Sequence, residues 1–282
     1  MAIKIPEQER RTREELKEHY EIEKELADRL RNSTREQRRQ LYSSTYDELY
    51  KRVPSHPQLT RKHSREVIAR GVARRMRLLR RYLRASHVFL ELGAGDCSLS
   101  FEVAKHARKV LAVDVSAEIT RHVAHPENFE LIISDGCSIP VPEGSVDVAY
   151  SNQLIEHLHP DDAVGQLQNV HKALAPTGIY ICITSNRLSG PHDISKYFDE
   201  VATGLHLKEY TFGELGELLR KAGFSSVQAY IGLRGAYLRC PLFFVHAWET
   251  MACALPPKLK KIMTHRLPFR AILETVVVVG MR

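Results

Sequence analysis

From residue 87 onward, short runs of β-branched and apolar residues alternate with longer stretches of helical periodicity. Such runs have the length and composition of buried strands, and strands that alternate with helices form βαβ units in a mainly parallel sheet. We therefore predict an α/β fold with a doubly wound, mainly parallel, seven-stranded sheet. The expected strands are residues 87–92, 110–113, 129–133, 146–151, 178–184, 227–231 and 275–281.

Residues 1–84 carry a helical pattern instead. The apolar positions of residues 7–31 recur mostly every fourth residue, which predicts an amphipathic helix lying on something larger. Ser33 and Glu36 fit a capping box, so a second helix should begin there and run to about Arg52. Ser64 opens a third helix that leads into the first strand. We predict a helical N-terminal extension or lid at 1–84.

The sheet-forming domain is expected at residues 85–282 with an insertion at 234–273, which is too long for a hairpin loop. Its residues 242–251 are rich in aromatic side chains and are followed by prolines and lysines. We predict a helical insertion before the last strand. Peripheral contact with a membrane surface through residues 242–261 is an alternative to burial in a lid or a dimer.

Composition excludes several classes of protein. The chain has 282 residues, of which 43% are hydrophobic and 27% charged, so neither wholesale disorder nor a membrane bundle is expected. The five cysteines are widely spaced without a C-x-x-C pair, which excludes a locally built zinc ribbon. Apolar runs do not exceed about five residues, far fewer than a bilayer-spanning helix needs. We expect a cytoplasmic protein.

The net charge of +7 is concentrated near the N-terminus. Residues 1–84 hold 23 basic and 13 acidic side chains, whereas the remainder holds 18 basic and 21 acidic ones. Between residues 49 and 84, Glu66 is the single acid among twelve bases. Such a segment could attract phosphate or an acidic surface, and a solvated helix face is the simpler interpretation.

The most informative segment joins the first two strands. The first strand ends at Glu91-Leu92 and runs into Gly93-Ala94-Gly95-Asp96-Cys97, after which a helix follows. Small residues at such a turn allow a ligand to approach the backbone. Asp114 closes the second strand, where an acid can accept both hydroxyls of a ribose.

A dinucleotide and S-adenosylmethionine compete for this geometry. The dinucleotide pattern needs a third glycine at position 98, which is Ser98 here. Glu91 and Asp96 would also repel a pyrophosphate, whereas they would attract the ammonium and sulfonium of S-adenosylmethionine. The acidic turn therefore favours the sulfonium cofactor.

The run from Glu91 to Cys97 resembles the first motif of class I S-adenosylmethionine-dependent methyltransferases, in the small-molecule (ubiquinone/menaquinone-type) branch. Cys97 departs from the pattern, which has a third glycine there. The resemblance extends to Glu156-His157, to the turn at 174–178 and to a Rossmann-like sheet. It implies cofactor binding by residues at the ends of the first four strands: Glu91, Gly93, Ala94, Gly95, Asp114, Val115, Asp135, Gly136, Ser151 and Asn152.

Methyl transfer from a sulfonium requires chiefly an aligned and desolvated nucleophile. A hydroxyl or ammonium acceptor also needs a base, for which histidine is suited. Our leading candidate is His192 assisted by Asp193, with His157 and His206 as rivals. His157 could equally be a structural histidine bonded to a backbone carbonyl, and His192-Asp193 could be a turn and helix cap.

A catalytic metal is conceivable from His157, His159, Asp161 and Asp162. Pro160 interrupts this run, and no ligand geometry follows from its spacing, so we predict no metal.

Tyr46, with Tyr42 and Tyr50, lies on one face of the second helix. An aromatic face suits a sulfonium, so Tyr46 is expected at the cofactor, although core packing explains the same spacing.

Three functions are compatible with this pattern. The leading hypothesis is methylation of an oxygen or nitrogen of a small molecule or glycan. The alternatives are methylation of RNA, suggested by the basic segment, and a non-catalytic binding protein with a methyltransferase fold. A nucleic-acid partner is not favoured, because aromatic and basic residues are not interleaved as in a base-reading surface.

Overall fold

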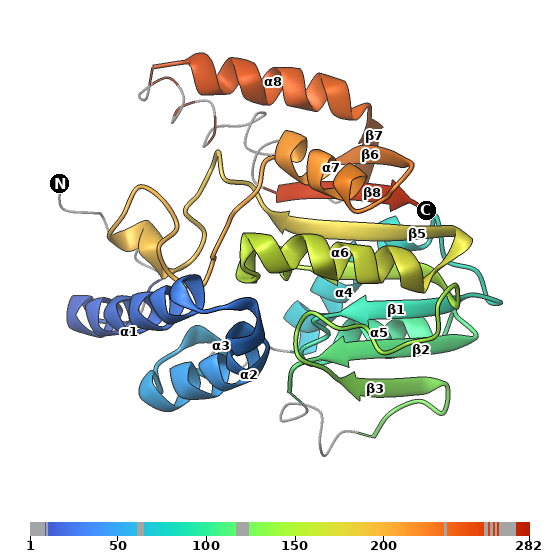
Figure 1. The fold of residues 1–282 in the computed structure, drawn as a ribbon, viewed down its shortest axis with the longest axis horizontal. Helices are drawn as coiled ribbons and strands as arrows, with labels where there is room; N and C mark the ends of the chain where they lie inside the picture. The colour runs from blue at the N-terminus through green and yellow to red at the C-terminus, as the bar shows by residue number, and fades with distance from the viewer. Residues whose placement is uncertain are drawn as a thin grey trace.

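The computed structural model describes residues 9, 11–60, 65–116, 124–233, 236–256, 259, 262, 264 and 275–282. Its centre is one mixed sheet in the order β3-β2-β1-β4-β5-β8-β6-β7 (Figure 1). The strands are β1 (Val88–Leu92), β2 (Lys109–Asp114), β3 (Phe129–Ile133), β4 (Val146–Asn152), β5 (Leu174–Ser185), β6 (Ser226–Leu233), β7 (Ala236–Cys240) and β8 (Thr275–Met281).

The doubly wound, mainly parallel sheet is confirmed, with eight strands in place of seven. β1 to β5 pair in parallel, whereas β8 runs antiparallel between β5 and β6. The additional strand is β7, which pairs antiparallel with β6. It occupies the start of the predicted helical insertion, so that part of the prediction is wrong. Tyr237 is buried in the sheet's core while Leu238 faces outward, which is the alternation of a strand.

Helices cover both faces of the sheet. On one face, α6 (Pro160–Ala173) and α7 (Phe212–Lys221) share a core cluster with inward residues such as Leu90 and Tyr180. On the other face, α4 (Arg65–Leu79) and α5 (Ser98–Ala104) share a second cluster that includes Phe89. Neighbouring residues of β1 thus face opposite layers, which explains why all five of its residues are buried.

The N-terminal helices are α1 (Arg13–Asn32), α2 (Arg35–Arg52) and α3 (Pro57–Thr60). The capping box of α2 is one residue later than predicted, because Thr34 is the N-cap and pairs with Gln37. The sequence offers Ser33 and Thr34 side by side, and either hydroxyl could cap. Ser33 instead forms the C-cap of α1.

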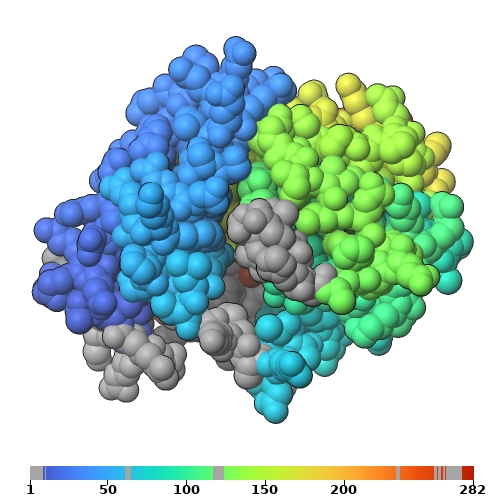
Figure 2. All heavy atoms as spheres, turned by 90° about the horizontal axis from the view of Figure 1, so that it is seen from below, coloured from blue at the N-terminus to red at the C-terminus, as the bar shows by residue number. Residues whose placement is uncertain are grey.

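α1, α2 and α3 lie beyond the ends toward which the arrows of β1, β2 and β3 point (Figure 1). They therefore cover the carboxyl edge of the parallel strands. In Figure 2 the blue N-terminal helices lie against the green part of the chain. The attachment includes a buried ion pair in which Arg38 Nε lies 2.5 Å from Asp162 Oδ2 at the start of α6. The lid at 1–84 stays a prediction, and the arrangement fits it for α1 to α3 only, because α4 belongs to the helical layer on the sheet.

The helical part of the insertion is α8 (Leu242–Ala254), which packs on α7 (Figure 1). Its buried Glu249 accepts hydrogen bonds from the N–H groups of Phe212 and Gly213, at 2.8 and 3.0 Å. A carboxylate is stabilised at a helix N-terminus because the first N–H groups lack partners and carry partial positive charge. Glu249 thereby fixes α8 on the first turn of α7.

No helix in the described part of the chain combines the length and the apolar composition that a bilayer-spanning helix needs. All five cysteines are free thiols in the structure.

Candidate functional site

The carboxyl ends of β1, β2 and β4 meet at one point of the sheet. Leu92 is in register with Val113 of β2 on one side and with Ser151 of β4 on the other. The chain order reverses direction across the sheet here, since β1 is flanked by β2 and β4. Open α/β sheets bind their ligands at such a switch point.

The turn after β1 has left-handed backbone conformations, with φ of 66° at Gly93 and 54° at Gly95. A Cβ on Gly95 would meet no other atom within 4 Å, so the backbone is open on that side. Cys97 also has a positive φ of 55°. This explains the glycine that the resemblance has at that position, because a residue with a Cβ is strained there by about 1 kcal/mol. Ala94 is buried and its carbonyl accepts from the Cys97 N–H.

Asp114 organises the turn from the end of β2. Its Oδ2 accepts from the Gly95 N–H at 2.8 Å, and its Oδ1 accepts from the N–H groups of Val115 and Ser116 at 2.7 and 3.2 Å. The carboxylate thereby ties the end of β2 to the glycine turn. Asp114 and Val115 are both half-buried at this edge, where the resemblance expects the ribose.

Glu91 does not line the turn as an exposed charge, and that part of the electrostatic argument is wrong. Its side chain lies in the core, where Oε2 accepts from the Ser100 hydroxyl of α5 at 2.6 Å. Burial raises the pKa of Glu91 to about 7, although the Ser100 hydrogen bond and Arg75 act in the opposite direction. Glu91 therefore holds α5 on β1. The sequence could not show this, because both faces of β1 are covered.

Asp135 and Gly136 lie beyond β3, beside α2. Asp135 Oδ1 accepts from the N–H groups of Cys137 and Ser138, and these bonds lower its pKa against the effect of burial. The carboxylate thus closes a turn, as an Asx residue does. Gly136 has a φ of 82°, and a Cβ there would touch the Tyr42 ring at 3.4 Å. The predicted cofactor residues Asp135 and Gly136 therefore lie against α2.

Ser151 is fully buried and exchanges a hydrogen bond of 2.6 Å with the Tyr180 hydroxyl. Its side chain serves the core, and its assignment to the cofactor stays a prediction. The β4 strand alternates its side chains between two layers, and the neighbouring Asn152 is half-exposed at the edge. Gln153 follows with a positive φ of 55° and accepts from Ser185 at 2.7 Å.

Tyr46 comes from α2 and lies at the site as well as in the core. Its ring packs against the first core cluster and meets His157 edge-on, with centroids 6.0 Å apart. Burial raises the pKa of its phenol well above 10, and the carboxylates of Glu156 and Asp114 contribute to the rise. Tyr46 therefore contacts one of the candidate histidines, and its place at the cofactor stays a prediction.

His157 and His206 are brought together from segments 49 residues apart. His157 is in η1 (Ile155–His157), and His206 lies in the segment between η2 (Ile194–Tyr197) and α7. Their ring centroids are 4.8 Å apart. His157 Nδ1 donates to the Leu205 carbonyl at 3.0 Å, and His206 Nδ1 donates to Glu209 Oε1 at 2.8 Å. Each ring is thus held through one nitrogen.

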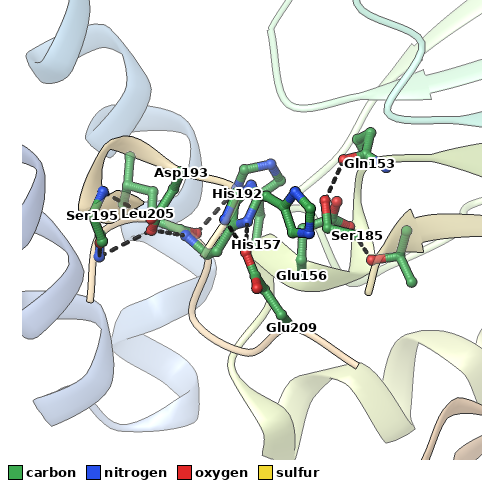
Figure 3. A network of polar contacts seen from close by, with 12 residues as sticks. Gln153, Glu156, His157, Ser185, His192, Asp193, Ser195, Leu205 and Glu209 are labelled. Carbon is green, nitrogen blue, oxygen red and sulfur yellow. Dashed lines mark hydrogen bonds and ion pairs between the residues drawn. The ribbon is translucent and has the colours of Figure 1, made fainter. Parts of the chain in front are cut away.

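The predicted pair of His192 and Asp193 is not formed. Asp193 Oδ1 accepts from the Ser195 N–H as the N-cap of η2, and Oδ2 accepts from the Gly204 N–H. His192 Nε2 donates to the Asn186 carbonyl at 3.0 Å. The prediction that Asp193 assists His192 is therefore wrong, because backbone N–H groups occupy that carboxylate. Figure 3 shows Asp193 beside Ser195, on the side of the N-terminal helices.

Two site residues were given no role at the site by the sequence analysis, although Glu156 was part of the Glu156-His157 motif. Glu209 accepts both from the His206 ring and from the His192 N–H, so it joins the two loop histidines. Glu156 is fully buried beside His157 (Figure 3), and its Oε2 accepts from Thr184 at 2.7 Å. The sequence signals were adjacency to His157 and the three-residue spacing from His206, which indicate an acid near each histidine.

The structure gives separate roles to the residues that the sequence analysis considered as metal ligands. His159 is the N-cap of α6 and accepts from the Asp161 N–H, whereas Asp162 pairs with Arg38. Those residues therefore act at the helix start and in the lid contact.

Known proteins share this fold and these motifs. Residues 90–182 match the family described as "Methyltransferase domain". A probable S-adenosylmethionine-dependent methyltransferase of Mycolicibacterium smegmatis is 31% identical over 136 residues, which are 48% of this chain and 51% of that protein. A protein of the same description from Mycobacterium tuberculosis is 31% identical over 139 residues, covering 49% of this chain and 48% of its own. The chain spans about half the length of these curated relatives.

A solved S-adenosylmethionine-dependent methyltransferase from Archaeoglobus fulgidus superposes with a TM-score of 0.53 at 15% identity, covering 86% of this chain and 100% of that one. This likeness concerns the fold alone. The family match over residues 90–182 and the curated relatives support a class I S-adenosylmethionine-dependent methyltransferase domain in this chain. The cofactor of this domain is S-adenosylmethionine. The ubiquinone/menaquinone-type branch stays a prediction.

Proposed function

We propose that this chain transfers the methyl group of S-adenosylmethionine to an oxygen or nitrogen of a small molecule or glycan. The proposal depends chiefly on one observation, the pairing of His157 and His206 at the edge that carries the cofactor turn. The cofactor turn supplies the methyl donor, and the histidine pair supplies polar groups for the acceptor. Asp114, Asp135, Gly136 and Asn152 are proposed cofactor contacts at that edge.

His157 is suited to hold the acceptor. Its Nδ1–H is fixed on the Leu205 carbonyl, so the lone pair belongs to Nε2. Burial and the neighbouring His206 lower the pKa of His157 to about 3, which keeps Nε2 unprotonated near neutral pH. It can therefore accept a hydrogen bond from a hydroxyl or amine and orient its lone pair toward the methyl carbon. In the transfer, the new bond to carbon forms as the S–CH₃ electron pair returns to sulfur, and the proton of the acceptor leaves through His157 Nε2 to solvent.

The N-terminal lid supports a small acceptor. Glu23 of α1 accepts from the Leu205 N–H at 3.0 Å, and Leu205 in turn holds His157. Tyr46 of α2 packs on the same imidazole. Helices therefore contact the reacting region directly, which suits exclusion of water from a small acceptor. A glycan end or a single small molecule fits this arrangement better than a folded nucleic acid.

The experiment is a binding and turnover assay on the full chain. S-adenosylhomocysteine should raise the melting temperature, and incubation with S-adenosylmethionine and panels of phenols, amines and glycans should yield a product heavier by one methyl group. Binding of a nicotinamide nucleotide in place of S-adenosylhomocysteine would refute the cofactor assignment. Cofactor binding without turnover on any acceptor, protein or RNA would favour the non-catalytic alternative.

RNA remains the alternative acceptor, because α4 carries several arginines on its exposed face, among them Arg70, Arg74 and Arg77. Binding of mixed tRNA and rRNA that falls steeply between two salt concentrations, with methylated RNA as product, would favour it.

Peripheral membrane contact through 242–261 is a separate expectation. Phe243 and Phe244 of α8 are 65% and 58% exposed, whereas Lys258, Lys260 and Lys261 lie outside the described residues. Co-sedimentation with liposomes tests it.

A further inference from the structure

Glu156, His157 and His206 form a compact cluster at the acceptor side of the proposed site. One carboxylate oxygen and one ring nitrogen from each histidine all lie within 4.8 Å of one another. Glu156 and His206 are buried and His157 is half-buried. Ligand atoms on a tetrahedral ion with bonds of about 2.1 Å lie roughly 3.4 Å apart, so small side-chain adjustments would close the cluster on one ion.

The two imidazoles are oriented as metal ligands usually are. A ligating histidine normally donates its second N–H to a carbonyl or carboxylate, which fixes the ring and its tautomer. His157 does this on the Leu205 carbonyl and His206 on Glu209, both through Nδ1. The Nε2 atoms are therefore the ones left for ligation.

The Glu156 carboxylate gives independent evidence that a ligand binds at this cluster. Its side chain is fully buried, and Oε2 is used by Thr184. Oε1 has no hydrogen-bond partner among the described residues. A buried oxygen without a partner costs about 1–3 kcal/mol and calls for an explanation, such as an ion.

We propose that Glu156, His157 and His206 bind one divalent transition-metal ion, through one carboxylate oxygen and two Nε2 atoms. This donor set suits Zn²⁺, Mn²⁺, Fe²⁺ or Co²⁺ better than Mg²⁺ or Ca²⁺, which prefer oxygen ligands. It departs from the sequence-based prediction of no metal. Three protein ligands leave a coordination position open, as in catalytic metal sites.

The role of the ion in the reaction rests on the proposed function, whereas the binding of the ion does not. An acceptor hydroxyl that binds the open position releases its proton to solvent more readily, because the ion stabilises the oxyanion. The oxygen lone pair then forms the O–CH₃ bond, and the S–CH₃ pair remains on sulfur as S-adenosylhomocysteine. With the ion bound, the histidine lone pairs serve as ligands and the ion replaces His157 as the holder of the acceptor.

A second cluster, formed by His19, Glu23 and His56, has similar spacing and differs in its hydrogen bonds. Arg11 donates to His19 Nδ1 at 2.7 Å, so His19 must use Nε2 to donate to Glu23, at 2.9 Å. Both nitrogens of His19 are thus occupied. His19 is therefore the control for the loss of a buried histidine in another cluster of similar composition.

The test is titration of the metal-free full chain with Zn²⁺ by calorimetry, and with Co²⁺ by visible absorption. We expect one ion per chain, with affinity reduced at least tenfold in His157→Ala, His206→Ala and Glu156→Gln and unchanged in His19→Ala. Glu209→Gln keeps all three ligands and removes only the anchor of His206, so it should weaken binding about tenfold to hundredfold. Circular dichroism and melting temperature identify any variant that fails to fold, and Glu209→Gln then carries the test.

The proposal is overturned if the wild-type chain binds no ion, or if binding persists in His157→Ala and is lost in His19→Ala. S-adenosylhomocysteine binding, measured on the metal-free chain, separates the two proposals. If the nucleoside binds and methyl transfer proceeds without any ion, the role of the ion in the reaction is refuted and the methyltransferase proposal stands. If the nucleoside does not bind, the methyltransferase proposal fails whatever the ion does.

Discussion

His157 and His206 meet edge to face, with an interplanar angle of 81°. The two rings have opposite electrostatic surroundings. Burial and His206 lower the pKa of His157 to about 3, whereas hydrogen bonding to Glu209 and the nearby carboxylates of Glu156 and Asp193 raise that of His206 despite its burial. The pKa values of the two rings are therefore shifted in opposite directions, in a site that both loops must assemble.

Replacing His157 by alanine should lower kcat about tenfold to hundredfold, because the acceptor loses a hydrogen bond of about 1.5–3 kcal/mol. KM for S-adenosylmethionine should change little. His192→Ala should have a smaller effect, since its Nε2 is engaged with the Asn186 carbonyl. His106→Ala, on the exposed surface, is the control. Steady-state kinetics measures all three, and equal rates for His157→Ala and His106→Ala would contradict the assignment.

Asp114→Ala should weaken S-adenosylhomocysteine binding by about tenfold to hundredfold. The substitution removes the acceptor of the Gly95 N–H as well as the proposed ribose contact. A hydrogen bond to a charged group is worth about 1.5–3 kcal/mol. Asp114→Asn should be weakened less, because an amide oxygen can still accept from Gly95. Calorimetric titration gives the affinities, and wild-type affinity in both variants would exclude Asp114 from the cofactor site.

Asp162→Ala should lower the free energy of unfolding by about 3 kcal/mol, because it leaves the buried Arg38 guanidinium without its partner. Tyr42 would also lose its acceptor, at 2.8 Å. Replacing both members by Arg38→Met and Asp162→Leu should restore part of the loss, since no buried charge remains. Urea unfolding measures the series. A loss below 1 kcal/mol for Asp162→Ala would mean that the lid is held by other contacts.

Glu91 should make the folded state less stable as pH rises from about 4.5 to about 7. Burial raises its pKa to about 7, so over that range the folded chain keeps a proton that the unfolded chain has released. Glu91→Gln should therefore be more stable than the wild type by about 2–3 kcal/mol at pH 8 and equal to it below pH 4.5. Melting temperatures across this range test the sign, with the exposed Glu217→Gln as control. A stability gain that is independent of pH would contradict it.

The sequence predicted the features that depend on local spacing. The positions of the strands, the glycine turn after β1 and the helices on both sides follow from runs and periods along the chain. They agree with the structure within a few residues. Two features differ from the prediction. Thr34, and not the neighbouring Ser33, is the N-cap of α2. The start of the insertion forms the strand β7, where a helix was predicted.

The direction of buried side chains could not be predicted in the same way. β1 and β4 are covered on both faces, so their apolar runs carry no alternation that would tell which layer Glu91 or Ser151 faces. Their polar side chains serve the core, at Ser100 and Tyr180. A family motif identifies a residue position in the sequence, whereas packing decides whether the side chain at that position reaches the ligand.

The sequence by itself determined the class of fold and the cofactor turn, because a tight turn between strand and helix needs its small residues in one continuous segment. Only the tertiary structure decided which histidines meet. His157 and His206 are far apart in the chain, and their pairing depends on Leu205 and Glu209 from the segment before α7 and on Glu23 from α1. Contacts of this kind are set by packing between elements, which no local pattern encodes.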